Sequence, residues 1–119
     1  MSIDFSGGID LVLSSLGNTT ISINLSGGGI DCSLKYGEYT GESKLSIKID
    51  GGALNMDIEL PSNAKVRLDG SISGGSCNID VDGNRVSGNY MDQGYSSAST
   101  RLYISYNVSG GVASMGIKR

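Results

Sequence analysis

The chain has 119 residues, a formal net charge of −3 and no histidine, with glycine at 19 positions and proline at one. This length fits a single domain, covering residues 1–119, that can bury a core without help from a metal or a disulfide. Glycine without much proline excludes collagen, and regular apolar alternation along the chain excludes disorder. The basic residues are scattered, and nucleic-acid binding needs a basic face, so we expect no nucleic-acid partner.

No apolar run approaches the roughly 20 residues of a membrane-spanning helix. The first residues lack the basic stretch and the following apolar stretch of a signal peptide. We therefore expect no direct membrane insertion by this chain. Two interpretations of its location stay open: a cytoplasmic protein, or a soluble piece of a longer protein whose targeting segment has been removed.

Apolar and polar residues alternate in paired runs, which is the pattern of half-buried strands. Each pair of runs flanks a glycine pair, and no stretch has helical apolar spacing. In chain order the predicted strands are residues 3–5 and 9–13, 21–25 and 30–34, 45–49 and 54–60, 66–72 and 77–81, and 102–108 and 113–117. Residues 36–42 break the pattern as a loop, residues 82–84 give a turn signal, and residues 83–100 form one irregular insert.

The glycine pairs recur at residues 7, 28, 51, 74 and 110, so the successive spacings are 21, 23, 23 and 36 residues. Periods of this size indicate a solenoid, because a unit of two strands cannot bury its apolar face alone and needs stacked neighbours. We predict an all-β fold, a one-sided β-helix or β-roll of about five rungs that stack in chain order.

We predict that the glycine pairs are structural corners. Ile72 and Cys77 flank one pair five positions apart, and an odd offset sends two side chains to opposite faces of a straight strand. Both can face inward only if the chain bends between them, which glycine permits without Cβ strain. A phosphate-binding glycine loop is the alternative, but it requires a following helix. The predicted corner residues are Gly7, Gly8, Gly27, Gly28, Gly51, Gly52, Gly74, Gly75, Gly110 and Gly111.

The two cysteines, Cys32 and Cys77, fall at inward positions two repeats apart, in adjacent columns of the repeat. With strands about 4.8 Å apart, the two residues are separated by about 10 Å, which is too far for a disulfide. We expect reduced thiols in the core, and a disulfide or a redox role stays open as the alternative.

Three features resemble the C-terminal domain of LiaF-like envelope-stress proteins and the related toast-rack domains, also described as adhesin-like or cell-wall-active-antibiotics-response modules. They are the glycine corner with the alternating residues after it, as in residues 51–61, the next strand at residues 64–72, and the insert at residues 94–98 before the last strand pair. The resemblance covers most of the chain from about Leu25. It implies a one-sided β-helix or roll without a catalytic site, which acts through protein contacts near the cell envelope.

The chain departs from the family's pattern at its corners. The family usually has Gly-x-Gly there, and this chain has Ser or Asp followed by two glycines. The family's transmembrane segments have no counterpart in the sequence. The resemblance therefore implies a fold and an association with the envelope, and it assigns no residue a role in sensing or restraining a partner.

Groups that could carry catalysis are scarce. Without histidine the chain lacks the usual general base and the commonest metal ligand, and the cysteines lack zinc-site spacing. Residues 80–84 resemble the start of a calcium loop, but the glycine comes early and no glutamate follows, so a turn is preferred. A solvated polar face accounts for the outward carboxylates, although a glycosidase pair among them is an alternative. These carboxylates are Asp50, Asp57, Glu59, Asp69, Asp80 and Asp82. We predict no enzyme activity, no catalytic residue, no cofactor and no metal ligand.

Six of the seven aromatic residues are tyrosines. Tyrosine is favoured in contact surfaces because it offers a large area and a polar tip. One interpretation is an interaction surface made by Tyr39, Tyr90, Tyr95 and Tyr103, and the other is that these rings cap the open side or the ends of the roll. The sequence leaves both open.

We predict a non-catalytic module for protein interaction or structure. The alternative is self-assembly into dimers or filaments, because strand edges pair unless they are blocked, and the terminal runs Ile3–Leu13 and Ala113–Ile117 carry few charges. The partner is then a protein or a second copy. A carbohydrate-active β-helix is a third hypothesis.

Overall fold

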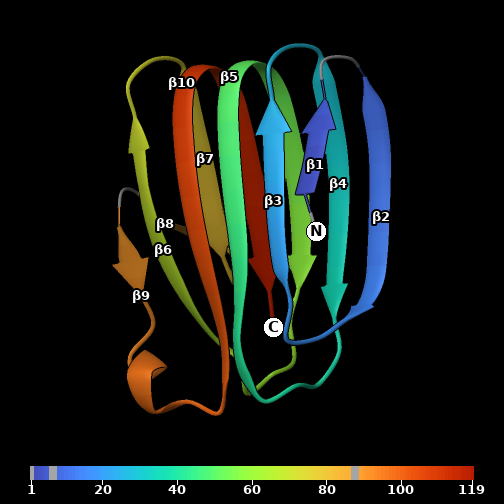
Figure 1. Ribbon diagram of the computed structural model, residues 1–119. Helices are drawn as coiled ribbons and strands as arrows, with labels where there is room; N and C mark the ends of the chain where they lie inside the picture. Colours follow the sequence, from blue (N-terminus) through green and yellow to red (C-terminus); the bar gives the residue numbers. More distant parts are fainter. Residues whose placement is uncertain (1, 6–7, 87–88) are drawn as a thin grey trace.

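The computed structural model describes residues 2–5, 8–86 and 89–119, and the described chain is almost entirely β-structure, which confirms the predicted all-β class (Figure 1). All ten strands belong to one sheet. One short 3-10 turn, η1, covers Tyr95–Ser97. No helix in the described part is long and apolar enough to cross a membrane. The strands are β1 (Ser2–Phe5), β2 (Ile9–Leu16), β3 (Thr20–Leu25), β4 (Gly29–Tyr36), β5 (Gly41–Glu59), β6 (Lys65–Ile72), β7 (Ser76–Val81), β8 (Asn84–Val86), β9 (Tyr90–Met91) and β10 (Thr100–Lys118).

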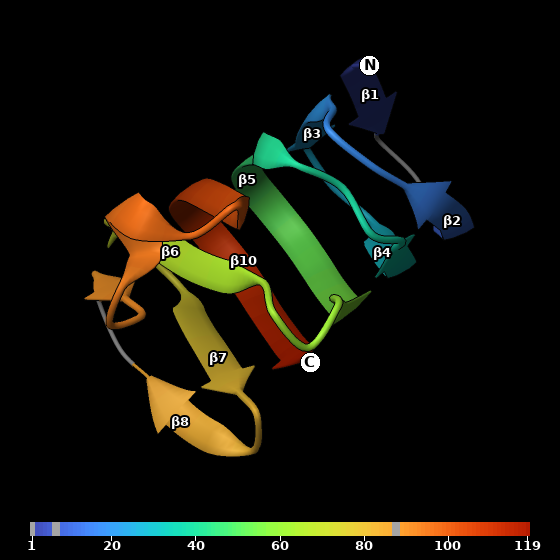
Figure 2. The same cartoon turned by 90° about the horizontal axis from the view of Figure 1, so that it is seen from below.

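The chain forms five repeat units, each of which runs up one layer and returns down a second layer (Figure 2). Unit 1 is β1 with β2, unit 2 is β3 with β4, unit 3 is β5, unit 4 is β6 with β7, and unit 5 is β10. Layer A contains β1, β3, the first halves of β5 and β10, and β6, whereas layer B contains β2, β4, the second halves of β5 and β10, and β7. Neighbours within a layer are parallel, because the returning strand of each unit supplies the long crossover that parallel pairing needs.

The units do not stack in chain order. Unit 5 lies between units 3 and 4, because β10 pairs with β5 on one side and with β6 and β7 on the other. The spatial order is therefore 1, 2, 3, 5, 4, and the predicted chain-order stacking is wrong. The prediction that Ala113–Ile117 forms a terminal edge is wrong for the same reason, since this segment pairs on both sides.

Two features of the chain account for the inserted position of β10. The five residues between β5 and β6 return from layer B to layer A and skip one strand position, a step of about 14 Å that five residues can span. In layer A, Tyr106 of β10 lies opposite Gly70 of β6, and a Cβ at Gly70 would lie 2.5 Å from the Tyr106 ring. The ring therefore occupies the space that the glycine leaves, and without β10 the next residue in this column would be Ile47.

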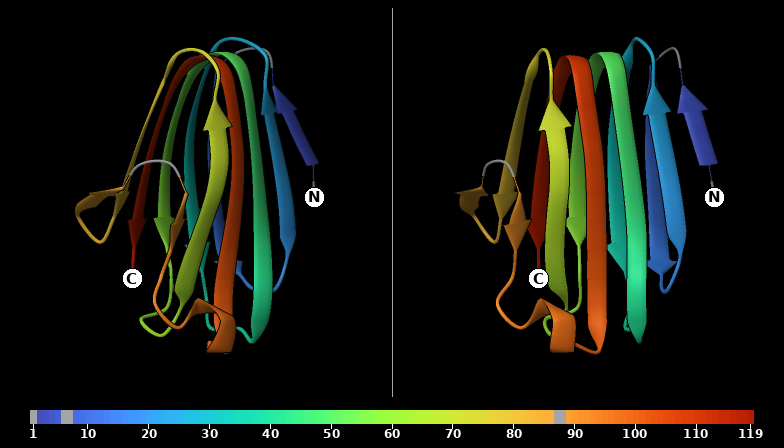
Figure 3. Two further views of the ribbon diagram at one scale, coloured as in Figure 1. Left: turned by 90° about the vertical axis from the view of Figure 1, so that its left-hand side faces the viewer. Right: turned by 60° about the vertical axis from the view of Figure 1, so that its left-hand side comes forward.

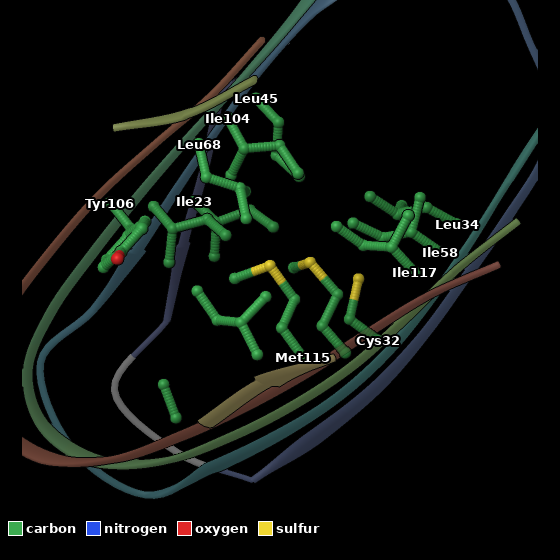
Figure 4. Close-up of a cluster of buried hydrophobic side chains, with 14 of the residues drawn as sticks. Ile23, Cys32, Leu34, Leu45, Ile58, Leu68, Ile104, Tyr106, Met115 and Ile117 are labelled. Carbon is green, nitrogen blue, oxygen red and sulfur yellow. The ribbon is translucent and has the colours of Figure 1, made fainter. Parts of the chain in front are cut away.

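The core lies between the two layers, and the labelled side chains in Figure 4 point into it. Ile49 and Leu54 are both buried on either side of the β5 corner, as are Val108 and Ala113 on either side of the β10 corner. Each pair is five positions apart, so the inward positions change parity at the bend, and a straight strand would turn half of them to solvent. The prediction that Ile72 and Cys77 both face the core is not met at the end unit, where Ile72 is 44% exposed and Cys77 is half-buried.

Glycines in the left-handed region mark the corners. Gly28, Gly52, Gly111 and Gly75 have φ values of 85°, 93°, 86° and 78°, and they follow one another in the spatial order of their units. A Cβ on Gly75 would overlap the carbonyl oxygen of Gly111, and the backbone carbon and nitrogen of Gly111 would both lie 2.9 Å away. The backbones therefore approach too closely for any side chain at this position.

The other predicted corner glycines lie beside these four. Gly27, Gly74 and Gly110 sit at the same bends, and Gly51 has φ 156°. Gly8 directly precedes β2, whereas Gly7 lies outside the described residues. If the second pair is taken as Gly27 and Gly28 within the run of three glycines at 27–29, the four glycines with φ near 80–90° are the second members of their pairs.

The insert is more regular than the sequence predicted. Asp82 and Gly83, with φ 51° and 83°, connect β7 to β8 as a two-residue hairpin, which confirms the predicted turn. β8 then pairs antiparallel with β7, and β9 pairs antiparallel with β6. The segment predicted as an irregular insert at about 83–100 contains two short strands and the η1 turn, and strands of three and two residues are too short to produce a periodic signal.

The cysteines are free thiols. Cys32 is buried on β4, and burial raises its pKa to about 11, while Cys77 on β7 is half-buried. Because unit 5 intervenes, the two cysteines lie three units apart rather than the two units that chain order suggested. The expectation of unpaired thiols is confirmed.

Candidate functional site

The two ends of the sheet differ (Figure 3). At the unit 4 end, β9 pairs with Arg67 and Leu68 of β6, and β8 pairs with residues 79–81 of β7, so both edges are partly covered. At the unit 1 end, β1 pairs with β3 and β2 pairs with β4, and no other described strand pairs with either. We call the free side of β1 and β2 the open edge. Its backbone N–H and C=O groups are available to a further strand.

The described side chains of β2 alternate as in a half-buried strand. Asp10, Val12 and Ser14 are exposed on the outer face, and Leu11 and Leu13 pack against the core from its end. Val12 is 75% exposed, more than Met91 at 58%, the next among the exposed large apolar side chains of the described residues. The open edge thus combines a row of backbone groups with apolar side chains on both faces.

A cluster around Asp92 holds the insert against the opposite end. The Asp92 carboxylate accepts a hydrogen bond from the backbone N–H of Val66 at 2.8 Å and another from the Tyr90 hydroxyl at 2.5 Å. The Arg119 guanidinium donates to both Asp92 and Asp82, and Nε lies 2.9 Å from Asp82 Oδ2. The side chain of Asp92 is 7% exposed and that of Arg119 is 16% exposed. Paired charges therefore hold the two short strands against this end of the sheet.

Three of the four tyrosines predicted to form a surface lie near one another on layer A. The Tyr39 hydroxyl donates to the carbonyl of Arg101 at 2.6 Å, and the Tyr95 hydroxyl donates to Glu42 at 2.8 Å. Glu42 and Arg101 are register neighbours on β5 and β10. Tyr103 is two residues further along β10. Tyr90 lies apart on β9, where its hydroxyl joins the Asp92 cluster.

Each of the four hydroxyl groups is bound within the chain. Tyr103 donates to Asp69 at 2.8 Å, and the Arg67 guanidinium lies 5.4 Å from the centre of the Tyr103 ring. The hydrogen bond to Asp69 raises the pKa of Tyr103, and burial raises the pKa of Tyr39 and of Tyr95. The tyrosines could be identified from the sequence, but the groups that accept their hydrogen bonds could not. Glu42 and Asp69 come close to Tyr95 and Tyr103 only when the strands stack, and nothing in the neighbouring sequence indicates these contacts. The tyrosine surface stays a prediction.

A shallow hollow of about 340 Å³ lies on the outer face of layer B beside Val12. It forms where Gly116 provides no side chain in a row that also contains Ser33 and Asp57. Glu59 lines the same hollow, and its carboxylate lies 3.7 Å from the Lys35 amino group, with both side chains well exposed. The hypothesis of carbohydrate cleavage also stays a prediction.

Among residues 2–5, 8–86 and 89–119, no three histidine, cysteine or acidic side chains lie close enough together to ligate a metal ion. Asp82, which the calcium-loop alternative would need as a ligand, is bound by Arg119.

Comparisons with protein-family models, with curated proteins and with solved structures found no match to this chain. The open edge is therefore the candidate site with the clearest structural basis.

Proposed function

We propose that this protein is a non-catalytic interaction module that binds a strand of another protein along its open edge. The unequal ends of the sheet carry this proposal. Strand edges associate unless they are covered, and the chain uses β8, β9 and the Asp92 cluster to cover only one end. An edge left uncovered on a protein that covers the other one is a binding surface.

The chemistry of the open edge defines the partner that fits it. A partner strand would form ladder hydrogen bonds with β2, each contributing about 1 kcal/mol net. Its side chains would alternate, with apolar ones against Leu11 and Leu13 on the core side and against Val12 on the outer side. The partner segment is thus extended, about eight residues long like β2, and alternately apolar.

Two finer assignments belong to the same proposal. We assign the fold to the short β-solenoids, with five corner-linked rungs in a permuted stacking order. The resemblance to toast-rack domains adds that the partner is met near the cell envelope. The glycine corners at residues 51–52, 74–75 and 110–111 support both assignments.

Peptide selection with a matched pair of variants tests the binding surface. Random peptides displayed on phage are selected on the immobilised chain, and the affinities of selected peptides are measured by fluorescence polarisation. Val12→Lys should weaken binding by at least about tenfold, because it places a charge against the incoming strand. Val112→Lys is the control, because Val112 is 48% exposed on β10 and has neighbours Ala53 and Ser76 on both sides.

Amide hydrogen exchange locates the bound peptide. We expect bound peptides to slow exchange in residues 9–16 and to leave β6 and β7 unchanged. The open edge is not the interaction surface if peptides bind the two lysine variants equally well. The same conclusion follows if bound peptides slow amide exchange around Tyr39, Tyr95 and Tyr103 instead.

A further inference from the structure

We propose that the natural occupant of the open edge is a second copy of this chain. The two copies pair antiparallel along β2 about a twofold axis, which gives a closed dimer and no filament. This inference rests on the proposed function and adds the identity of the partner.

The unequal ends of the sheet determine the type of assembly. A filament requires the unit 1 end of one copy to join the unit 4 end of the next, and there β8 and β9 occupy the positions beside residues 79–81 and 67–68 that a full-length incoming strand would need. Only a contact between two open edges remains, and such a contact uses the same surface on both copies. Two identical strands related by a twofold axis and paired side by side are necessarily antiparallel.

The sequence of β2 is complementary to itself in this orientation. With Val12 on the twofold axis, Val12 of one copy lies opposite Val12 of the other, Leu11 lies opposite Leu13, and Asp10 lies opposite Ser14. Inward side chains meet inward ones and outward side chains meet outward ones, which is the condition for a shared register. No like charges oppose each other, and Val12, the most exposed large apolar side chain among the described residues, packs beside its own copy.

Sedimentation equilibrium over a wide concentration range tests the dimer. The wild-type chain should show a monomer–dimer equilibrium with no larger species. Val12→Lys should raise the dimer dissociation constant by at least about tenfold, since two lysines would face each other, whereas Val112→Lys should leave it unchanged. Mixing Val12→Lys with Val12→Glu should restore a dimer that contains one copy of each variant.

A cysteine variant tests the register. Directly opposed residues in an antiparallel pair have Cα atoms about 4.5–5.5 Å apart, a distance that a disulfide can bridge. Val12→Cys should form an intermolecular disulfide under mild oxidation. Val112→Cys, which carries the same two native cysteines, should form no intermolecular disulfide under the same conditions.

The outcomes separate this inference from the proposed function. A chain that stays monomeric at all concentrations but binds selected peptides along β2 overturns the dimer and keeps strand addition. A monomer that binds no peptide at β2 overturns both. Growth into filaments would show that the unit 4 end is not closed, which contradicts the inference.

Discussion

The substitution Gly75→Ala tests the physical basis of the corners. Gly75 has φ 78°, and its α-carbon faces the backbone of Gly111 on β10. An added methyl group would overlap the carbonyl oxygen of Gly111 and would lie 2.9 Å from the carbonyl carbon and the amide nitrogen of that residue. The neighbouring atoms belong to backbone in the middle of the sheet, so they cannot move aside as a flexible side chain could.

The expected loss of stability has two parts. The left-handed conformation costs a residue with a Cβ about 1–2 kcal/mol, and forcing extra volume into a packed site costs about 1–3 kcal/mol. Gly75→Ala should therefore lower the free energy of unfolding by about 2–5 kcal/mol, a large share of the about 5–15 kcal/mol of a typical domain.

Gly83→Ala is the matched control. Gly83 has φ 83°, close to that of Gly75, but a Cβ there would have no atom within 4 Å. This variant should lose only the conformational part, about 1–2 kcal/mol. With a urea dependence of about 2 kcal/mol per molar, the unfolding midpoint should fall by about 1–2.5 M for Gly75→Ala and by less than about 1 M for Gly83→Ala. If Gly75→Ala loses no more stability than Gly83→Ala, close stacking at the corner is not what requires glycine.

Three further predictions concern buried polar groups, and each can be checked by urea unfolding. Tyr36→Phe should leave stability unchanged or raise it by up to about 1 kcal/mol, because the buried Tyr36 hydroxyl has no hydrogen-bond partner in the described part of the chain. Tyr95→Phe should cost about 1 kcal/mol, because it removes the hydrogen bond to Glu42. Equal effects of the two substitutions on stability would contradict this difference between the hydroxyl groups. Burial raises the pKa of Tyr36 above its unfolded value near 10, so the free energy of unfolding should fall as the pH rises beyond about 10. The fall should be less steep in Tyr36→Phe. Identical pH profiles of the two proteins would show that Tyr36 does not cause the fall. Asp92→Asn should lower the free energy of unfolding by about 3 kcal/mol, because the Arg119 cation loses a buried partner, and amide exchange in β6 and β9 should become faster. A loss of stability below about 1 kcal/mol would show that the cluster does not hold the insert.

The strands and their corners could be predicted from the sequence because their signals are local. Alternation gives the strands, and the five-residue offset from Ile49 to Leu54 shows that the chain bends at the glycines. Asp82-Gly83 specifies its hairpin by the same local logic, since few residues adopt the two positive φ values of that turn.

The stacking order could not be predicted because every unit has the same inward columns. The polarity of the inward side chains allows any unit to stack beside any other. The order of the units therefore depends on the sizes of the side chains that meet, as where the ring of Tyr106 lies over Gly70. The sequence placed residues 3–13, which include most of β1 and β2, at one end of the stack, as the structure does. It placed residues 113–117 of β10 at the other end, where the structure has β6 and β7. The Asp92 cluster joins residues 82, 92 and 119 through the fold alone, so the sequence gives no hint of it.

Amide hydrogen exchange of β2, measured at low and at high protein concentration, tests the central claim most directly. The claim is that two copies of the chain pair through the open edge of unit 1 and not through the unit 4 end. Amides of residues 9–16 that do not face β4 should exchange fast in dilute solution and become protected as concentration rises, while exchange in β6 and β7 should not depend on concentration. Exchange in residues 9–16 that does not depend on concentration, or concentration-dependent protection at β6 and β7 instead, would contradict the claim.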